Sequence, residues 1–199
     1  MKLIKKEILV EKFERYDIET KNHNFIAENI VIHNSNMKCV YSDGQIYVGS
    51  KSRWVKDEDG NEFWRAFKSN PNIEKFCVEN PNLVLWGEEY GKVKGFPYDC
   101  NPGQVKFRAF DIRRQDFTFL DVPEFLELTT RYGIDTVPQL GNIPFDRDTI
   151  TSMAEGETTL GKAKMKEGIV VKPMVNRMDR RCEGRVVLKL VSNKYLEKV

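Results

Sequence analysis

The chain has 199 residues, a hydrophobic fraction of 40% and a formal net charge of +2, so it holds enough apolar material for one or two packed domains. The near-neutral charge does not argue for a nucleic-acid-binding protein, although it permits a local basic groove. The 4 cysteines form no C-x-x-C pair and predict reduced thiols in a cytosolic protein, and no apolar run suits a signal peptide or a membrane span.

The first part of the chain, residues 1–34, alternates in short strand-like pieces. Residues 7–10 and 15–20 are predicted strands, and residues 25–32 are a predicted hairpin. This part is too small to bury a core of its own. Its last apolar strand runs directly into the triplet at 33–35.

That triplet, His33-Asn34-Ser35, has the groups needed to break a peptide bond at an asparagine. The Asn34 side-chain amide can attack its own backbone carbonyl, and His33 can polarise that carbonyl or protonate the leaving amine. The Ser35 hydroxyl can carry an acyl group from another segment. The alternative is a strand that ends in an ordinary polar turn.

From Ser35 onward the pattern predicts an α+β fold of antiparallel sheets with packed helices. One helix has clear signals at both ends, Pro123 at its start and Gly133 after its last turn. The predicted strands are 37–41, 45–48, 82–86, 105–112, 167–172 and 184–191, and the predicted helices are 71–78, 123–132 and 148–154.

Charged side chains stand within these apolar strands and at their ends. Buried charges are costly unless they are paired or used, which makes them candidate site residues. The alternative for each is a strand-end residue that faces solvent. The set is Arg53, Glu88, Asp111, Glu167, Lys172 and Lys189.

Residues 13–35 closely resemble the C-terminal end of an intein. Tyr16-Asp17-Ile18, the segment Asn-His-Asn-Phe-Ile-Ala at 22–27, an apolar strand and the triplet at 33–35 follow that family's order. The resemblance implies that residues 1–34 are a C-terminal split-intein fragment with strands of the intein (HINT) β-fold. It also implies that Asn34 cyclises, His33 assists it, His23 activates the scissile bond, Asp17 supports the earlier acyl transfer and Ser35 is the acceptor nucleophile.

Met1 lies at a distance from Asn34 that is typical of the C-terminal half of a naturally split intein. The resemblance therefore implies a protein partner, an N-terminal intein half carried by another polypeptide.

Residues 35–199 resemble the covalent nucleotidyltransferases, and among them the phage-type RNA ligases. This resemblance implies an antiparallel-sheet nucleotidyltransferase domain of the ATP-grasp-like ligase type, which uses ATP and Mg²⁺ and acts on RNA. A phage-encoded ligase would work in its host's cytoplasm. The matching motifs, in order, lie at 49–53 (Gly-Ser-Lys-Ser-Arg), 85–91, 107–112, 167–172 and 188–196.

The resemblance also implies roles for the charged residues. Arg53, Lys172 and Lys189 would neutralise phosphate charge. Glu88 would accept hydrogen bonds from the ribose, and the Phe110-Asp111 motif would bind the nucleotide, with Phe110 stacking on adenine. Glu167 suits Mg²⁺, which prefers oxygen ligands. Val191 departs from the family, where many members have a second lysine, and no RNA-docking module follows in this chain.

The lysine that attacks the nucleotide in this family is missing. It belongs to a Lys-x-(Asp/His)-Gly motif just before the Ser-Asn that opens the first hairpin, and here intein-like residues precede Ser35-Asn36. Lys56 lies after the hairpin with the wrong spacing. The two resemblances together imply a precursor whose trans-splicing completes an ATP-dependent RNA ligase. The alternatives are a non-catalytic nucleotide- or RNA-binding remnant and a ligase that acts on DNA.

Overall fold

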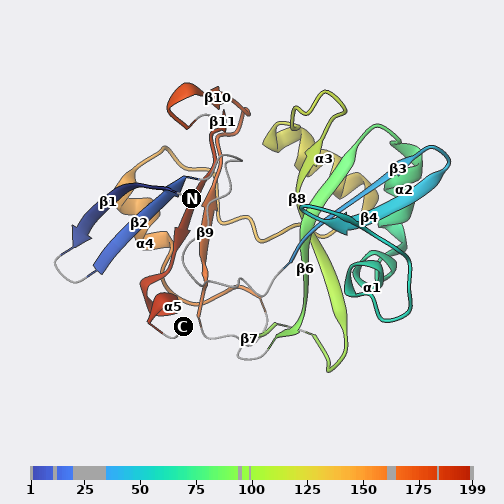
Figure 1. Ribbon diagram of the computed structural model, residues 1–199, viewed down its shortest axis with the longest axis horizontal. Coiled ribbons are helices and arrows are strands. Elements are labelled where there is room, and N and C mark those ends of the chain that lie inside the picture. Colours follow the sequence, from blue (N-terminus) through green and yellow to red (C-terminus); the bar gives the residue numbers. More distant parts are fainter. Residues whose placement is uncertain are drawn as a thin grey trace.

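The computed structural model describes residues 2–10, 13–19, 35–93, 96–98, 100–160, 165–182 and 184–197. An antiparallel sheet of six strands forms the larger body (Figure 1). In the sheet, β6 pairs with β3 on one side and with β8 on the other. The strands are β3 (Ser35–Ser42), β4 (Gln45–Ser50), β5 (Trp54–Val55), β6 (Val84–Val93), β7 (Phe96–Pro97) and β8 (Val105–Arg113).

Helices α1 (Glu62–Lys68), α2 (Pro71–Glu79) and α3 (Val122–Tyr132) pack against this sheet and against one another. Side chains alternate between the two faces of a strand. Met37 and Cys39 of β3 are therefore both buried in the main core, whereas Lys38 between them lies against Trp54 and Trp86. The sheet thus has one face in the core and a second face on which polar side chains can gather.

A β-bulge interrupts the pairing of β6 with β8. Trp86 pairs with Asp111 and Gly87 pairs with Ala109, which leaves Phe110 without a partner residue. A Cβ on Gly87 would lie 2.3 Å from the Phe107 ring, so only glycine fits there. Bulges re-aim side chains, and this one lies at the predicted nucleotide-binding motif.

A second group of elements follows α3 in the chain and lies on the left of Figure 1. Its small core joins Ile150 and Ala154 to Ile169. The Glu155 carboxylate accepts hydrogen bonds from Ser192 Oγ at 2.9 Å and from the Asn193 backbone N–H at 2.7 Å, which fixes the last helix. The elements are α4 (Arg147–Met153), β9 (Gly168–Val171) paired with β12 (Leu188–Val191), β10 (Met178–Asp179) paired with β11 (Gly184–Arg185), the 3₁₀ helix η1 (Arg180–Cys182) and α5 (Asn193–Leu196).

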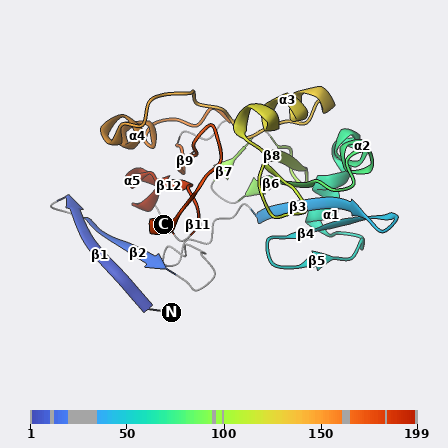
Figure 2. The same ribbon diagram turned by 90° about the horizontal axis from the view of Figure 1, so that it is seen from above.

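The first part of the chain contributes β1 (Lys2–Val10) and β2 (Phe13–Glu19), an antiparallel hairpin that pairs with no other strand of the described residues (Figure 2). Asp17 lies on β2, and Ser35 opens β3. The predicted hairpin at 25–32, together with His23, His33 and Asn34, lies outside the described residues. The intein-type fold therefore stays a prediction.

From residue 35 onward the α+β prediction with antiparallel sheets is confirmed. Gly133 has φ 63° and ends α3 in the left-handed conformation, as its position predicts. The elements that were not predicted include the helices α1 and α5 and the short strands β5, β7 and β10. The strand predicted at 184–191 is divided into β11 and β12. None of the helices in the described ranges has the length and apolar character that crossing a membrane requires.

Candidate functional site

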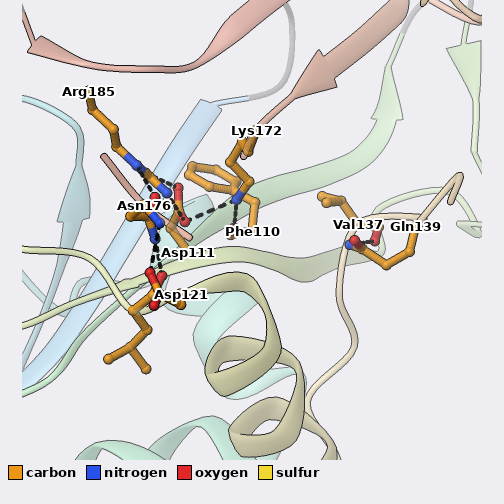
Figure 3. A network of polar contacts seen from close by, with 9 residues as sticks. Phe110, Asp111, Asp121, Val137, Gln139, Lys172, Asn176 and Arg185 are labelled. Carbon is orange, nitrogen blue, oxygen red and sulfur yellow. Dashed lines mark hydrogen bonds and ion pairs between the residues drawn. The ribbon is translucent and has the colours of Figure 1, made fainter. Parts of the chain in front are cut away.

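Asp111, near the end of β8, is the centre of a buried cluster of charges. It is only 6% exposed, and two cations from the second group of elements converge on it (Figure 3). Lys172 Nζ lies 3.0 Å from Oδ1, and the Arg185 guanidinium donates two hydrogen bonds, at 2.7 Å to Oδ2 and 2.9 Å to Oδ1. A bidentate, charge-assisted contact of this kind fixes both distance and orientation.

Lys172 follows β9 directly, so the end of that strand delivers its amine to the end of β8. The amine also donates to the Phe110 carbonyl at 2.6 Å, which is the backbone of the bulge. Burial lowers the pKa of Lys172, while the neighbouring Asp111 acts in the opposite direction. The bulge, the lysine and the aspartate therefore form one unit.

Arg185 is the residue of this cluster that sequence reasoning missed. Its Nε donates to Asn176 Oδ1 at 2.6 Å, and its guanidinium lies 4.2 Å from the Phe119 ring centroid. The Asn176 backbone N–H in turn donates to Asp121 Oδ1 at 2.7 Å, just before α3. Arg185 thus joins β11 to the main sheet. Nothing in the sequence distinguishes Arg185 as a site residue, because several arginines occur in the same segment.

A second cluster joins Glu88 of β6 and Glu167, just before β9, to Lys189 of β12. Burial raises the pKa of Glu88, the Glu167 carboxylate raises it further, and Lys189 opposes the change. Burial lowers the pKa of Lys189, and both carboxylates oppose that change. The Tyr98 hydroxyl donates to Glu167 Oε1 at 2.5 Å and fixes that side chain. Lys189 therefore interacts electrostatically with both carboxylates.

The structure brings together most of the residues predicted from sequence, but in two clusters. Phe110, Asp111 and Lys172 form the first, and Glu88, Glu167 and Lys189 form the second. Arg53 lies exposed between β4 and β5, where its backbone N–H donates to Ser50 Oγ at 3.3 Å. Within the described ranges, no hydrogen bond or ion pair joins the Arg53 side chain to either cluster.

These clusters have the chemistry of a site for an anion accompanied by a metal ion. Lys189 supplies a positive charge beside two oxygen-bearing side chains, and Mg²⁺ is usually bound through one or two carboxylates plus ligand phosphates. The described residues contain no group of three or more ligating side chains that would hold a metal ion by themselves. A divalent cation at Glu88 and Glu167 would therefore need further oxygen ligands from the anion or from water.

Glu89 follows Glu88 in β6 but lies on the opposite face of the strand, where it gives the fold a pH dependence. Burial raises its pKa to about 7, and the nearby Glu62 adds to the effect. The unfolded chain loses this proton first, so the contribution of Glu89 to stability is fully present below about pH 4.5 and is lost as the pH rises to about 7. Glu89→Gln should remove this decline and be about 2 kcal/mol more stable than the wild type at pH 8.

Urea unfolding from pH 4.5 to pH 8 measures this effect for Glu89→Gln. Glu58→Gln, at an exposed loop position, is the matched control and should keep the wild-type decline. An identical pH dependence in Glu89→Gln and the wild type would contradict the assignment.

Comparisons with known proteins point to one family. The family model described as RNA ligase matches residues 32–191. The Naegleria gruberi RNA ligase solved with PPi has 26% sequence identity and a TM-score of 0.69, with 83% of this chain and 48% of that chain covered. A lysine-to-methionine mutant of the same ligase, solved with AMP and Mn, has 27% identity and a TM-score of 0.70, with 83% and 49% covered.

A lysine-to-alanine mutant, solved with ATP and Mn, has 26% identity and a TM-score of 0.69, with 83% and 49% covered. The chain thus spans about half the length of these solved ligases. No curated protein sequence gives a significant match.

Proposed function

The chain belongs to the RNA ligase family, and from this premise we propose that residues 35–199 are the nucleotide-binding core of an ATP-dependent RNA ligase. The observation that carries the proposal is the buried contact of Asp111 with both Lys172 and Arg185, and Lys189 interacts electrostatically with Glu88 and Glu167. Charges of this kind are costly to bury and are retained where a charged ligand uses them.

The residues present fit both ATP and a divalent cation, the two groups found with the Naegleria gruberi mutants. Lys189 would hold phosphate oxygens, since its ammonium is the positive charge that interacts with both Glu88 and Glu167. Glu88 and Glu167 would hold Mg²⁺ or the ribose hydroxyls. The bound nucleotide supplies the activated phosphate that strand joining requires.

Lys172 and Asp111 would act on the nucleotide in a different way. Asp111 is saturated by Lys172 and Arg185, so we assign it to positioning. Its contact holds the Lys172 amine against the bulge at Phe110, where the predicted adenine-stacking ring lies. Arg53, exposed and apart from both clusters, would reach the phosphates only from the β4–β5 turn.

We also propose that residues 1–34 are removed by protein trans-splicing. Asn34 would cyclise, Ser35 would accept the acyl group, and His33, His23 and Asp17 would assist. Two observations support a boundary here: the intein-like motifs end at Asn34, and the family match begins at residue 32. The separate pairing of β1 with β2 is compatible with a removable segment. The partner would carry the N-terminal intein half and the missing lysine.

Replacement of Asn34 tests the splicing proposal. Asn34→Ala lacks the side-chain amide that breaks the bond before Ser35, so mixing it with an N-terminal half should give no spliced product by mass spectrometry. Asn29→Ala keeps the reacting amide and is the matched control, which should splice like the wild type. Spliced product from Asn34→Ala would contradict the proposed role of this residue.

A further inference from the structure

An open groove of about 340 Å³ lies at one end of the main sheet, on the face that carries Glu88. On β6, Val84 lines this groove and lies four residues before Glu88 on the same side of the strand. At about 3.3 Å per residue, the groove therefore begins about 13 Å from the proposed nucleotide site. Its walls come from β3 to β6, from the end of β8 and from the turn that follows β8.

Aromatic rings and cations alternate along this face. Lys38 Nζ lies 4.3 Å from the Trp54 ring centroid and 5.5 Å from that of Trp86. The Arg113 guanidinium lies 5.8 Å from the Trp86 ring centroid and 4.9 Å from that of Phe117. Trp54, Arg113 and Phe117 line the groove itself. A row of this composition is suited to bases, which stack on aromatic rings and on guanidinium groups.

Phe117 is held in a position that packing does not explain. Its side chain is 72% exposed, and its φ of 68° is one that a bulky residue rarely adopts. The turn around it is fixed: the Arg114 backbone N–H donates to the Thr118 carbonyl at 2.7 Å, and Thr118 Oγ1 donates to Asp116 at 2.6 Å. Strained backbone conformations cluster at functional sites, and here the strain presents an apolar ring to solvent.

Two buried donors along the same row support this interpretation. Within the described residues, Trp86 Nε1 and Arg113 Nε have no hydrogen-bond partner although both atoms are buried. Unpaired buried donors are uncommon in native structures, because each loses its bonds to water. They show that this row is not optimised as an internal packing layer.

The charged residues of the groove favour a ligand that binds by stacking on the rings over one that binds by electrostatic attraction alone. Arg114 is paired with Glu124 at 2.6 Å, and Asp43 adds a carboxylate to the lining. Arg113 is the cation that remains without a carboxylate partner among the described residues lining the groove. A ligand with one phosphate per unit and flat rings between the phosphates matches this arrangement better than an acidic peptide does.

We propose that this groove binds single-stranded RNA, with unpaired bases stacked on Trp54 and Phe117 and a backbone phosphate at Arg113. The proposal rests on the RNA ligase function proposed above and gives it a docking surface for the strand that enters the nucleotide site. Tyr47, whose ring centroid lies 5.8 Å from that of Trp54, extends the stacking surface.

Fluorescence anisotropy of a labelled oligouridylate, titrated with the full chain, tests the proposal. Phe117→Ala should weaken binding about 5- to 100-fold, the range for loss of one base-stacking ring. Phe145→Ala is the matched control, because Phe145 is equally exposed at 70% but lies outside the groove lining. It should bind like the wild type. No binding by the wild type, or the same loss in both variants, would overturn the proposal.

Two further arms separate this surface from the nucleotide site. Excess ATP should leave the oligouridylate bound, and a duplex RNA of the same length should bind more weakly, because its bases are not free to stack. Displacement by ATP, or equal binding of the duplex, would overturn the proposal. A further outcome is that the chain neither binds ATP nor splices while Phe117→Ala still weakens oligouridylate binding and Phe145→Ala does not. That result would contradict the ligase proposal and support the RNA-binding proposal for the groove.

Discussion

Replacing Asp111 with asparagine should lower the free energy of unfolding by about 3–5 kcal/mol, the usual effect of removing one partner from a buried ion pair. The substitution would leave Lys172 and Arg185 without the carboxylate that both contact, at 3.0 Å and 2.7 Å. Each cation would then remain desolvated without full compensation. Urea unfolding at neutral pH measures the change directly.

Glu127→Gln is the matched control for Asp111→Asn, since it makes the same carboxylate-to-amide change in an exposed pair. Glu127 lies 2.8 Å from Arg131, but the two side chains are 71% and 63% exposed. Such a pair contributes less than about 0.5 kcal/mol. Equal effects of the two substitutions would show that Asp111 does not hold the two groups of elements together.

Replacing Lys189 with alanine should weaken ATP binding about 10- to 100-fold, the loss expected when a hydrogen bond to a charged group is removed. Lys189 is also the charge that opposes the raised pKa of Glu88. Without it, the pKa of Glu88 should rise further, so the loss of affinity should be larger at lower pH. Isothermal titration with ATP and Mg²⁺ measures both effects.

Lys194→Ala is the control for Lys189→Ala, because Lys194 is an exposed lysine on the nearby helix α5. It should bind ATP like the wild type. Wild-type affinity in Lys189→Ala, or an equal loss in Lys194→Ala, would remove Lys189 from the nucleotide site. RNA binding in the groove at Phe117 should be the same in both variants.

Elements with local signals could be predicted from the sequence. The turn at Asp43-Gly44 has positive φ at both residues, and such dipeptides are typical of tight hairpins. Helix α3 begins beside Pro123 and ends at Gly133. Helix α1 was missed because aromatic residues such as Phe63 and Trp64 favour strands by propensity. Its one clear signal is Asn61, whose side chain accepts a hydrogen bond from the Trp64 backbone N–H.

The parts of the site that could not be predicted depend on contacts between distant segments. The bulge at Phe110 exists because β6 and β8 shift register, and no residue pattern within β8 encodes that shift. The break between β11 and β12 follows a change of partner, from β10 to β9. Arg185, on β11, becomes part of the site only because the chain changes its partner strand in this way. Asp111 was predicted to contact the nucleotide. Its contacts with two cations, Lys172 and Arg185, were not predicted.

Covalent attachment of AMP, measured by intact mass after incubation with ATP and Mg²⁺, tests the central claim most directly. The chain alone should gain no AMP, because the attacking lysine is supplied by another segment. After incubation with an N-terminal half, the joined product should lack residues 1–34 and should gain one AMP. An AMP adduct on a lysine of the chain alone would contradict the claim, because the nucleophile would then lie within these 199 residues.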